Sequence, residues 1–467
     1  MAHVLRAPGS AYSVQCILQI FHKLCACHLL NMHQSLHTSR KGDDTCEFEA
    51  FQSGHCSGTM LDVAREIQKQ IGLEPGYYSI PKCRANLLKY QPAQKDLPER
   101  TMKDSFTTAV LPLSTVPIRE RYVNHLGRVR IGRLMEELDL FAVWICHRHL
   151  CIPTLPKGIP VPYNFVTFLY DSVDFTNINR ISASEDIELC GHVSWTGNSC
   201  MELTIYIRQI MQTIAKAIIM MVARNATNTR SAPVNALEPA NEEEKLCLAN
   251  SIKRQKKRMA KQSKSVLNIK PTSSDGKLMY EIFKRTRGMN ALGIRSMPSK
   301  LPPNCKWMSQ SFQTTMLHAF PENRNSHNYI FAGFVMRSAV EISFITACIH
   351  AGGRPLIQCI MDVEFYRPLK MNSFLKVTSY VVYTFERYIQ LLTIVQALDA
   401  NNMVQITTNA LHLTYKAERN VTEVLPSTYQ ETLWYINGRN KFHAFQKLRE
   451  ARKVNKESQT SVRTGEN

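Results

Sequence analysis

GRLMEELDLFAVWICHRH (132–149) and GFVMRSAVEISFITACIH (333–350) are the two stretches of sequence that decide the fold. Both begin with Gly, carry Met at the fourth position and end in His after an apolar stretch that contains Cys. Each predicts a largely buried helix of about five turns, because apolar residues cover most of its faces. The similarity of the two stretches indicates that the chain contains two copies of one structural unit.

The pattern changes to that of β-strands after each predicted helix. Runs rich in β-branched and aromatic residues follow, separated by turn residues such as Thr196-Gly197-Asn198 and Asn401-Asn402. The runs are FVTFLYDSVDF (165–175), GHVSW (191–195), SCMELTIYI (199–207) and AIIMMVARN (217–225) in the first copy, and PLIQCIMDVEFYRPL (355–369), SFLKVTSYVVYT (373–384), YIQLLTIVQAL (388–398) and TTNALHLTYKAERN (407–420) in the second. We therefore expect an α+β fold with two tandem domains, each an antiparallel sheet wrapped around a long central helix.

The length and composition agree with two globular domains. The chain has 467 residues, of which 44% are hydrophobic and 20% charged, and these values are typical of globular rather than disordered or collagen-like proteins. A helix that spans a membrane needs about 18 or more consecutive apolar residues. The best stretch, residues 14–30, is interrupted by Gln, His and Lys, so we exclude a membrane-spanning protein.

The net charge of +19, from 57 basic and 38 acidic residues, lies mostly outside the two copies. Residues 1–42 carry +4, residues 253–264 (KRQKKRMAKQSK) carry +7, and residues 439–467 carry +5. Clustered Lys and Arg bind nucleic acids and anionic membranes, but neither copy is strongly basic. For the run at 253–264 we favour a solvated helix face. A nuclear address or a nucleic-acid patch is the alternative, although no aromatic residues for single-strand binding stand beside it.

The first 44 residues are typical of a mitochondrial transit peptide followed by a disordered leader. Residues 1–42 contain no acidic residue and several Ser, and apolar residues recur at helical spacing in 14–24. A secretory signal and a disordered tail are the alternatives, but the apolar part of a secretory signal would have to contain His22 and Lys23. We expect import into the mitochondrion.

Composition divides the rest of the chain into five segments. After the leader (1–44) we expect an N-terminal extension (45–105), a first domain (106–230), a charged linker with helical pieces (231–305), a second domain (306–422) and a basic C-terminal tail (423–467). The linker is assigned from its Pro, Asn and charged residues, which favour exposed structure.

Fourteen cysteines are spread without regular spacing, which does not indicate a disulfide framework. Two clusters offer metal ligands, Cys25-Ala-Cys27-His28 and Cys146-His147-Arg148-His149-Leu150-Cys151. The first lies in the predicted leader. The side chains of the second would point in several directions on a helix, and the paired CxxC motifs of structural zinc are missing. We expect no metal site.

Several blocks together carry a resemblance to a known family. They are RTMKDSF (101–107), VRIGRLMEELD (129–139), an acidic segment with GHVSW and GNSCME (185–202), MVARN (221–225), PVNALEP with EEE (233–244), and NRNSHNYIFAGFVMR with VEFYRPL in the second copy. Across residues 85–440 the chain resembles the double hot-dog acyl-coenzyme A thioesterases, in particular their mitochondrial type. The resemblance implies two tandem hot-dog domains.

The same resemblance implies an activity. These enzymes hydrolyse a fatty acyl-CoA to the free fatty acid and CoA, without a metal or other cofactor, because CoA is part of the substrate and product. A homo-oligomer in the mitochondrial matrix is also implied. The alternatives are a catalytically weak acyl-CoA-binding protein and, from residues 253–264, a nucleic-acid-binding protein.

Thioester hydrolysis needs a carboxylate to deprotonate water and backbone N–H groups to stabilise the oxyanion. A Gly that opens a buried helix lets the acyl chain approach those N–H groups, and Gly132 and Gly333 fit this role. Asp139 is seven residues after Gly132 and shares its helix face. The equivalent position in the second copy is Val340, and Glu341 is turned by roughly 100°. We therefore expect Asp139 to be the general base and the Gly333 amide to be the oxyanion donor, with Glu341 as a salt-bridged or supporting acid.

In the related enzymes, the site pairs a helix acid of one half with an Asn or Asp of the loop pattern G-N/D-x-F-G-G in the other half. On this chain the loop is 328–333, where Tyr329 takes the Asn/Asp position and Ala332 takes the position of the first Gly of the pair. Asn328 and Asn325 are the nearest water-orienting candidates. The first copy has Arg128 at the matching position and offers no substitute.

Four basic residues are candidates for binding the CoA phosphates through charge-assisted hydrogen bonds: Arg337, Arg354, Arg367 and Lys370. A solvated surface role is the alternative for each. A purely structural role is also open for Asp139, which stands near Arg133 on its helix. For His192 in GHVSW we favour a satisfied strand residue over a catalytic base.

Overall fold

The structure, a computed structural model, describes residues 55–73, 83–175, 177–262, 271–287, 301–325 and 328–464. The predicted transit peptide and its Cys25-Ala-Cys27-His28 cluster lie outside these residues.

The two halves of the chain follow one order of elements. The first half contains β2 (Thr107–Leu111), α5 (Ile131–His149), β3 (Tyr163–Asp174), β4 (Ile187–Thr196), β5 (Cys200–Gln209) and β6 (Gln212–Asn225). The second contains β8 (Phe312–His318), α8 (Ala332–Ala351), β9 (Leu356–Phe365), β10 (Ser373–Phe385), β11 (Tyr388–Asp399) and β12 (Gln405–Lys416). The predicted helix and four strands of each half are confirmed. The strand before each helix was not predicted, because TTAVL and FQTTMLH are short and rich in Thr.

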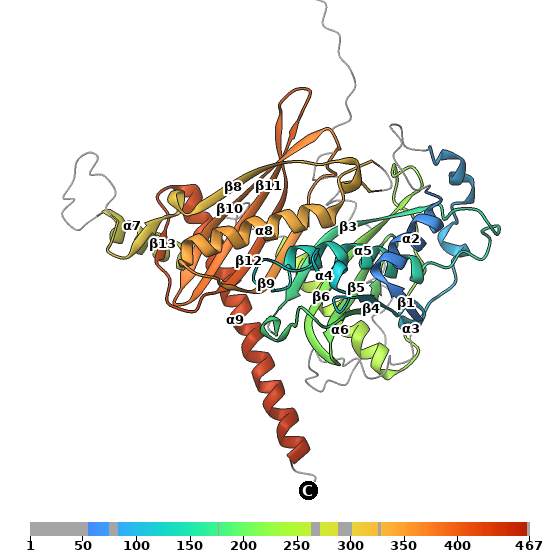
Figure 1. The fold of residues 1–467 in the computed structure, drawn as a ribbon, viewed down its shortest axis with the longest axis horizontal. Helices are drawn as coiled ribbons and strands as arrows, with labels where there is room; N and C mark the ends of the chain where they lie inside the picture. Colours follow the sequence, from blue (N-terminus) through green and yellow to red (C-terminus); the bar gives the residue numbers. More distant parts are fainter. Residues whose placement is uncertain are drawn as a thin grey trace, which may run out of the picture.

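All these strands belong to a single sheet of eleven strands, in the order β1-β2-β4-β5-β6-β3-β9-β12-β11-β10-β8. The halves meet where β3 and β9 pair antiparallel, with Leu169 opposite Glu364 and Asp174 opposite Cys359. The curved sheet holds α5 and α8 against one face, and both helices lie across the strands of their own half (Figure 1). The two hot-dog units are therefore joined edge to edge into one layer.

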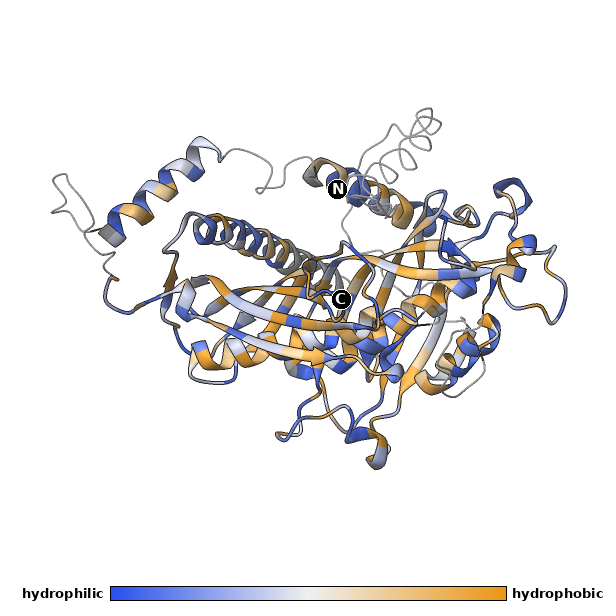
Figure 2. Ribbon diagram, turned by 90° about the horizontal axis from the view of Figure 1, so that it is seen from above, coloured by the Kyte–Doolittle hydropathy of each residue, from blue (hydrophilic) through white to orange (hydrophobic). Residues whose placement is uncertain are grey.

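The core lies between the sheet and the two central helices. In α5 the side chains of Leu134, Met135, Leu138 and Phe141 are fully or almost fully buried. Among the described residues, α8 is the one helix long and apolar enough to cross a membrane, but 61% of its most apolar window is buried inside the protein. That composition is what a core helix requires. Hydrophobic residues gather in the strands and the helices against them, whereas loops are mostly hydrophilic (Figure 2).

Gly132 and Gly333 mark the place where α5 and α8 pass each other. A Cβ at Gly132 would lie 3.0 Å from the Arg337 carbonyl oxygen, and a Cβ at Gly333 would lie 3.0 Å from the Glu136 carbonyl oxygen. Each glycine thus lets its helix approach the backbone of the other. This close helix contact accounts for both glycines, which we had assigned to the approach of an acyl chain.

The N-terminal extension covers the first half. Strand β1 (His55–Thr59) pairs in parallel with β2, and α2 (Met60–Ile71) follows it directly. A capping box between Thr59 and Asp62 begins α2, and Gly72 in the left-handed conformation ends it. Met60, Val63, Ile67 and Ile71 of α2 are buried, and the Trp144 indole of α5 donates a hydrogen bond to Ser57 at 2.8 Å.

Three further helices lie after the half-sheets: α6 (Glu242–Gln262), α7 (Ser273–Arg287) and α9 (Tyr429–Thr464). We expected residues 423–467 to be a basic tail, but their described part, up to Thr464, contains the short strand β13 (Glu423–Leu425) and α9. Tyr435, Ile436, Phe442 and Phe445 of α9 are buried, and the helix then leaves the body of the protein (Figure 1). An aromatic face therefore anchors its first part.

Candidate active site

Asp139 is a buried carboxylate with three hydrogen-bond partners. Only 1% of the residue is exposed. Its Oδ1 accepts hydrogen bonds from the Thr167 hydroxyl at 2.6 Å and the Tyr170 hydroxyl at 2.8 Å, both on β3. Its Oδ2 accepts one from the backbone N–H of Gly333 in α8, at 3.0 Å. Asp139, on the central helix of the first half, therefore contacts the first turn of α8, the central helix of the second half.

An irregularity in β3 puts the two hydroxyl groups on one face of the sheet. Residues 167 and 170 are three positions apart, so a regular strand would point them to opposite faces. The register between β3 and β6 shifts between Thr167 and Leu169 and again between Tyr170 and Ser172. Bulges of this kind re-aim side chains. The first shift lies between Thr167 and Tyr170, and it brings both hydroxyls onto one carboxylate oxygen.

Burial raises the pKa of Asp139 from 3.8 to about 6. The loss of hydration penalises the charged form, while the hydrogen bonds from Thr167, Tyr170 and Gly333 favour it and limit the rise. Burial also raises the pKa of Tyr170 well above its usual value, and the neighbouring carboxylate adds to this. At neutral pH the pair is therefore an ionised Asp139 and a phenol that donates to it.

The equivalent position of the second half is apolar. Gly132 and Gly333 are 201 residues apart, and the same offset places Val340 at the position of Asp139. Aligning YDSVDF (170–175) with IMDVEF (360–365) places Ile357 and Ile360 at the positions of Thr167 and Tyr170. All three of these aliphatic side chains are buried. One half has a carboxylate with two hydroxyls where the other has only hydrocarbon.

The Gly333 amide does not point to a free site. We expected it to bind an oxyanion, but its N–H donates to Asp139. The next amides of α8, those of Phe334 and Val335, donate to the Phe331 carbonyl at 3.1 and 3.4 Å. In this structure the start of α8 therefore holds the carboxylate in place.

Asn325 and Asn328 shape the loop before α8. The Asn325 side chain accepts a hydrogen bond from the Tyr329 N–H at 3.1 Å, and Asn328 has a φ of 60°. The equivalent loop before α5 has Asn124, whose side chain accepts from the Arg128 N–H at 3.1 Å, and Gly127 with a φ of 69°. Asn325 and Asn328 thus occupy turn positions that recur in the other half.

Neither asparagine is a partner of Asp139, whose hydrogen bonds come from Thr167, Tyr170 and Gly333. Both asparagines therefore have a structural explanation in the turn, and their water-orienting role stays a prediction.

Glu341 and Arg337 form ion pairs between the two helices. Glu341 pairs with Arg130, the residue that precedes α5, at 2.5 Å. Arg337 pairs with Glu136 at 2.8 Å, and its guanidinium lies 5.0 Å from the centre of the Phe334 ring. Arg133 also pairs with Glu136 and not with Asp139. The salt-bridged interpretation of Glu341 holds, and Arg337 is likewise engaged with a carboxylate.

The other predicted phosphate-binding residues do not converge. Arg354 is exposed just beyond the C-terminal end of α8, a helix of 20 residues and therefore about 30 Å long. Arg367 and Lys370 are exposed in the turn after β9. Lys370 forms a backbone bridge with Tyr329, beside the start of α8. Only Arg367 and Lys370 are therefore near the end of α8 that meets Asp139.

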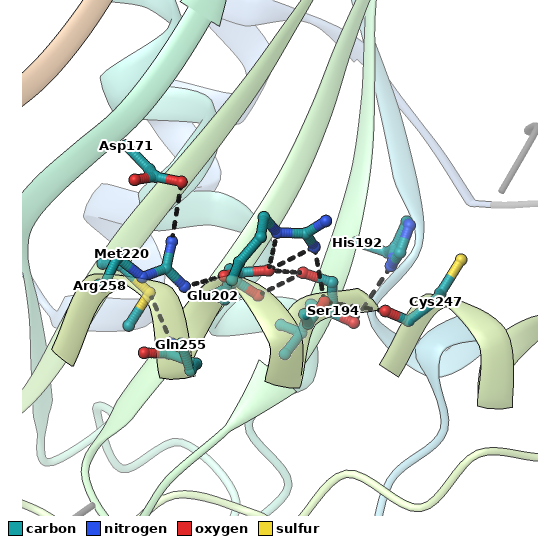
Figure 3. A network of polar contacts seen from close by, with 11 residues as sticks. Asp171, His192, Ser194, Glu202, Met220, Cys247, Gln255 and Arg258 are labelled. Carbon is teal, nitrogen blue, oxygen red and sulfur yellow. Dashed lines mark hydrogen bonds and ion pairs between the residues drawn. The ribbon is translucent and has the colours of Figure 1, made fainter. Parts of the chain in front are cut away.

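The basic run at 253–264 is partly buried in α6. Arg254 and Arg258 both pair with Glu202 of β5, which is 0% exposed. Arg258 also pairs with Asp171 of β3 at 3.1 Å (Figure 3). These contacts correct our interpretation of the run as a solvated face, which applies within the described part only to the exposed residues Lys253, Lys256 and Lys257.

The expected structural role of His192 is confirmed. It is 3% exposed and its ring Nδ1 lies 3.1 Å from the Val193 carbonyl. Burial lowers its pKa to about 4. It lines a small pocket with Lys216 and with Arg254 of α6, and Figure 3 shows its ring near Ser194 and Cys247.

Within the described ranges, no group of three or more His, Cys, Asp or Glu side chains could hold a metal ion. The cluster at 146–151 is dispersed: Cys146 is buried, His149 lies 3.0 Å from the Asn235 carbonyl, and His147 packs edge-on against Phe165.

Reasoning from sequence missed Thr167, Tyr170 and Glu202. A strand pattern could not bring Thr167 and Tyr170 together, because only bulges put them on one side. Glu202 had a usable signal, since it interrupts the apolar run CMELTIYI and Arg254 and Arg258 are spaced to share one helix face.

The sequence was compared with known proteins. No family model matches it. Mitochondrial acyl-coenzyme A thioesterase 9 of Mus musculus is 33% identical over 356 residues, which cover 75% of this chain and 80% of the relative. The Homo sapiens protein of the same name is 33% identical over 357 residues, with the same coverage. Mitochondrial acyl-coenzyme A thioesterase 4 of Humulus lupulus is 29% identical over 360 residues, covering 71% of this chain and 65% of the relative.

Among solved structures, an acyl-CoA hydrolase from Staphylococcus aureus in complex with butyryl coenzyme A aligns with 34% of this chain and 99% of its own. The aligned residues are 23% identical and the TM-score is 0.30.

Proposed function

We propose that Asp139 is the general base of the reaction that this protein catalyses. The chain belongs to the acyl-coenzyme A thioesterase family and is similar to its mitochondrial thioesterase 9 members. The protein is an acyl-CoA hydrolase, and it is mitochondrial. The observation that carries the proposal is the buried Asp139 carboxylate, held by two hydroxyls of its own half and one amide of the other.

The arrangement leaves one position for a water molecule. A carboxylate oxygen has two acceptor sites. Thr167 and Tyr170 fill those of Oδ1, whereas Gly333 fills one of the two on Oδ2. A water that donates to the open site of Oδ2 would lie beside the start of α8, next to the second half.

The reaction then follows from the position of that water. Asp139 takes a proton while the water oxygen attacks the thioester carbonyl carbon. The C–S bond breaks when the tetrahedral intermediate collapses, releasing the fatty acid, and the proton held by Asp139 passes to the leaving CoA sulfur. A base works best when its pKa is near the working pH, and the pKa of about 6 for Asp139 meets this condition.

The negative charge that develops on the carbonyl oxygen needs a positive partner. The Gly333 amide holds Asp139, so we assign this role to the positive end of the α8 dipole as a whole. For the CoA phosphates we assign Arg367 and Lys370, which lie beside the loop that leads into α8. No cofactor is proposed, because the carboxylate and the helix end supply the chemistry.

Three finer points belong to the same proposal. Residues 1–44 act as a transit peptide, the enzyme works in the matrix, and it assembles as a homo-oligomer. The composition of the leader supports the first two.

The experiment compares wild type with Asp139→Asn on acyl-CoA substrates of increasing chain length, measuring both released CoA thiol and acyl-CoA binding. We expect Asp139→Asn to bind the substrate and to lose roughly 10²–10⁴-fold in kcat, the range for removing a general base. Val340→Ala, at the equivalent position of the second half, is the matched control and keeps kcat within about threefold.

Two results would contradict the proposal. Binding without turnover in the wild type would identify an acyl-CoA-binding protein. Full turnover by Asp139→Asn would show that another group activates the water.

A further inference from the structure

Helix α6 lies directly behind the strand that supplies the Asp139 hydroxyls. Tyr170 of β3 contacts Asp139, and its neighbour Asp171 contacts Arg258 of α6 at 3.1 Å. Asp171 is the extra residue at the register shift between Tyr170 and Ser172, so regular alternation does not set its direction. Leu169, the residue before Tyr170, does alternate with it, and Leu169 packs on the side of Met259 of α6. The active carboxylate and α6 are therefore on opposite sides of β3, one residue apart.

The bulged segment of β3 packs against the same helix. Phe168 and Leu169, with Met220 of β6, form an apolar cluster with Met259 of α6. The Gln255 side-chain amide donates to the Met220 sulfur at 3.2 Å (Figure 3). Met220 pairs with Leu169 at the first bulge. Both sides of the irregular ladder thus rest on α6.

The helix itself is fixed by a buried ionic network. Glu202 accepts hydrogen bonds from Arg254, Arg258 and the Ser194 hydroxyl, which lies 3.1 Å away. Burial raises the pKa of Glu202, but the two guanidinium groups outweigh it and the pKa is lowered overall. Removing one partner of a buried ion pair leaves the other charge buried and unpaired, which is costly, so these pairs fix the position of α6 on the sheet.

We propose that α6 is a positioning element for hydrolysis: Arg258 and Met259 hold the bulged segment 167–171 so that the Thr167 and Tyr170 hydroxyls meet the Asp139 carboxylate. The proposal rests on the proposed function of Asp139. Its physical reason is that a strand loses ladder hydrogen bonds at each bulge, so contacts on the outer face must fix the segment between the two register shifts.

A disturbed segment has a specific signature. The groups that face the Asp139 carboxylate are the two hydroxyls on β3 and the Gly333 amide on α8, with Glu136 and Cys146 farther away on α5. The hydroxyl hydrogen bonds lower the pKa of Asp139. Loss of either bond therefore raises that pKa further, and the acid limb of the activity profile moves to higher pH.

The experiment measures kcat, KM and the pH profile of kcat for Arg258→Met and for Lys257→Met in the full chain. The two variants remove the same charge from adjacent positions, but Lys257 is exposed whereas Arg258 is 7% exposed. We expect Arg258→Met to lose on the order of tenfold in kcat, because small misplacements of catalytic groups are costly. Its acid limb rises by roughly one to two units, the worth of one hydrogen bond to a charge. Its KM and all values for Lys257→Met stay within about twofold of wild type.

Two milder variants guard against unfolding of Arg258→Met. Asp171→Asn removes the charge that pairs with Arg258 but keeps the shape of the side chain. Met259→Ala removes the apolar contact between α6 and β3. Both variants are expected to shift the acid limb to higher pH, as Arg258→Met does. A lower melting temperature with unchanged kcat and pH profile in all three variants would overturn the proposal and leave α6 with a stabilising role alone. If Asp139→Asn abolishes turnover and the α6 variants change nothing, only this inference fails.

Discussion

The two halves of the protein have the same elements but different interiors. Both have a central helix with a glycine where the helices cross, and both have an Asn-closed turn before that helix. The first half places Asp139 on its helix and two hydroxyls on its strand, where the second half has Val340, Ile357 and Ile360. The fold is thus preserved by a few backbone positions, and chemistry depends on three side chains that only one half has.

The surroundings of the halves differ as well. Helix α2 and β1 cover the first half, whereas Ile345 and Ile349 on α8 are 48% and 58% exposed. Outside the sheet, the first half carries α6 through a charged network around Glu202, and the second carries α9 through buried aromatic side chains.

The largest expected effect comes from putting an acid in the apolar half. Val340→Asp would bury a carboxyl group beside Ile357 and Ile360 without hydroxyl donors, at a cost of ~3–5 kcal/mol in the free energy of unfolding. Denaturant titration measures this loss. Adding Ile357→Thr and Ile360→Tyr should recover part of it. If the triple variant were no more stable than Val340→Asp, hydroxyl donors would not be what allows a buried acid at this position.

The reverse change, Asp139→Asn, removes the buried carboxyl group of the first half. The folded pKa of Asp139, about 6, is above its unfolded value of 3.8. The native state therefore binds this proton more tightly, and its contribution to stability is present below about pH 4 and lost as the pH rises through 6. Asn does not ionise, so Asp139→Asn should not lose stability over this pH range. Between pH 4 and pH 8, the free energy of unfolding of the variant should therefore rise by up to ~2 kcal/mol relative to that of the wild type. Equal pH dependence of melting in the two proteins would contradict it.

Substituting Gly132 or Gly333 distinguishes an effect on stability from an effect on catalysis. A methyl group at Gly132 or Gly333 meets the backbone of the other helix at 3.0 Å, so each Gly→Ala variant should lose ~1–3 kcal/mol. Only Gly333 donates to Asp139. Gly333→Ala should therefore lower kcat more than Gly132→Ala at equal loss of stability, and equal kcat values would sink the assignment of Gly333.

The smallest effects belong to the two turns. Asn325→Ala and Asn124→Ala each remove side-chain hydrogen bonds to loop amides, and each should cost ~1 kcal/mol. Both variants should keep kcat within about threefold. A tenfold loss confined to Asn325→Ala would return that residue to the catalytic site.

Much of the fold could be predicted because two apolar helices and eight strand-like runs recur in the same order. Asp139 could be predicted because a carboxylate seven residues after Gly132 shares its buried face. Its partners could not, since Thr167 and Tyr170 would point to opposite faces of a regular strand, and only the register shift between Thr167 and Leu169 puts them on one face. The roles of Asn325 and Asn328 were assigned from a loop pattern, whereas the matching turn in the first half needed the structure. The sequence favours a solvated basic run because Glu202, the buried partner of Arg254 and Arg258, lies about 50 residues away in the chain.

The pH dependence of kcat in the wild-type protein tests the central claim most directly. Asp139 acts as a base only when ionised, so kcat should fall as the pH drops through about 6, the pKa that burial sets for this carboxyl group. Tyr170→Phe removes one hydrogen bond that favours the ionised form, and its acid limb should lie at higher pH than that of the wild type. An acid limb near the ordinary carboxyl value of about 4, or one that Tyr170→Phe leaves in place, would contradict the account.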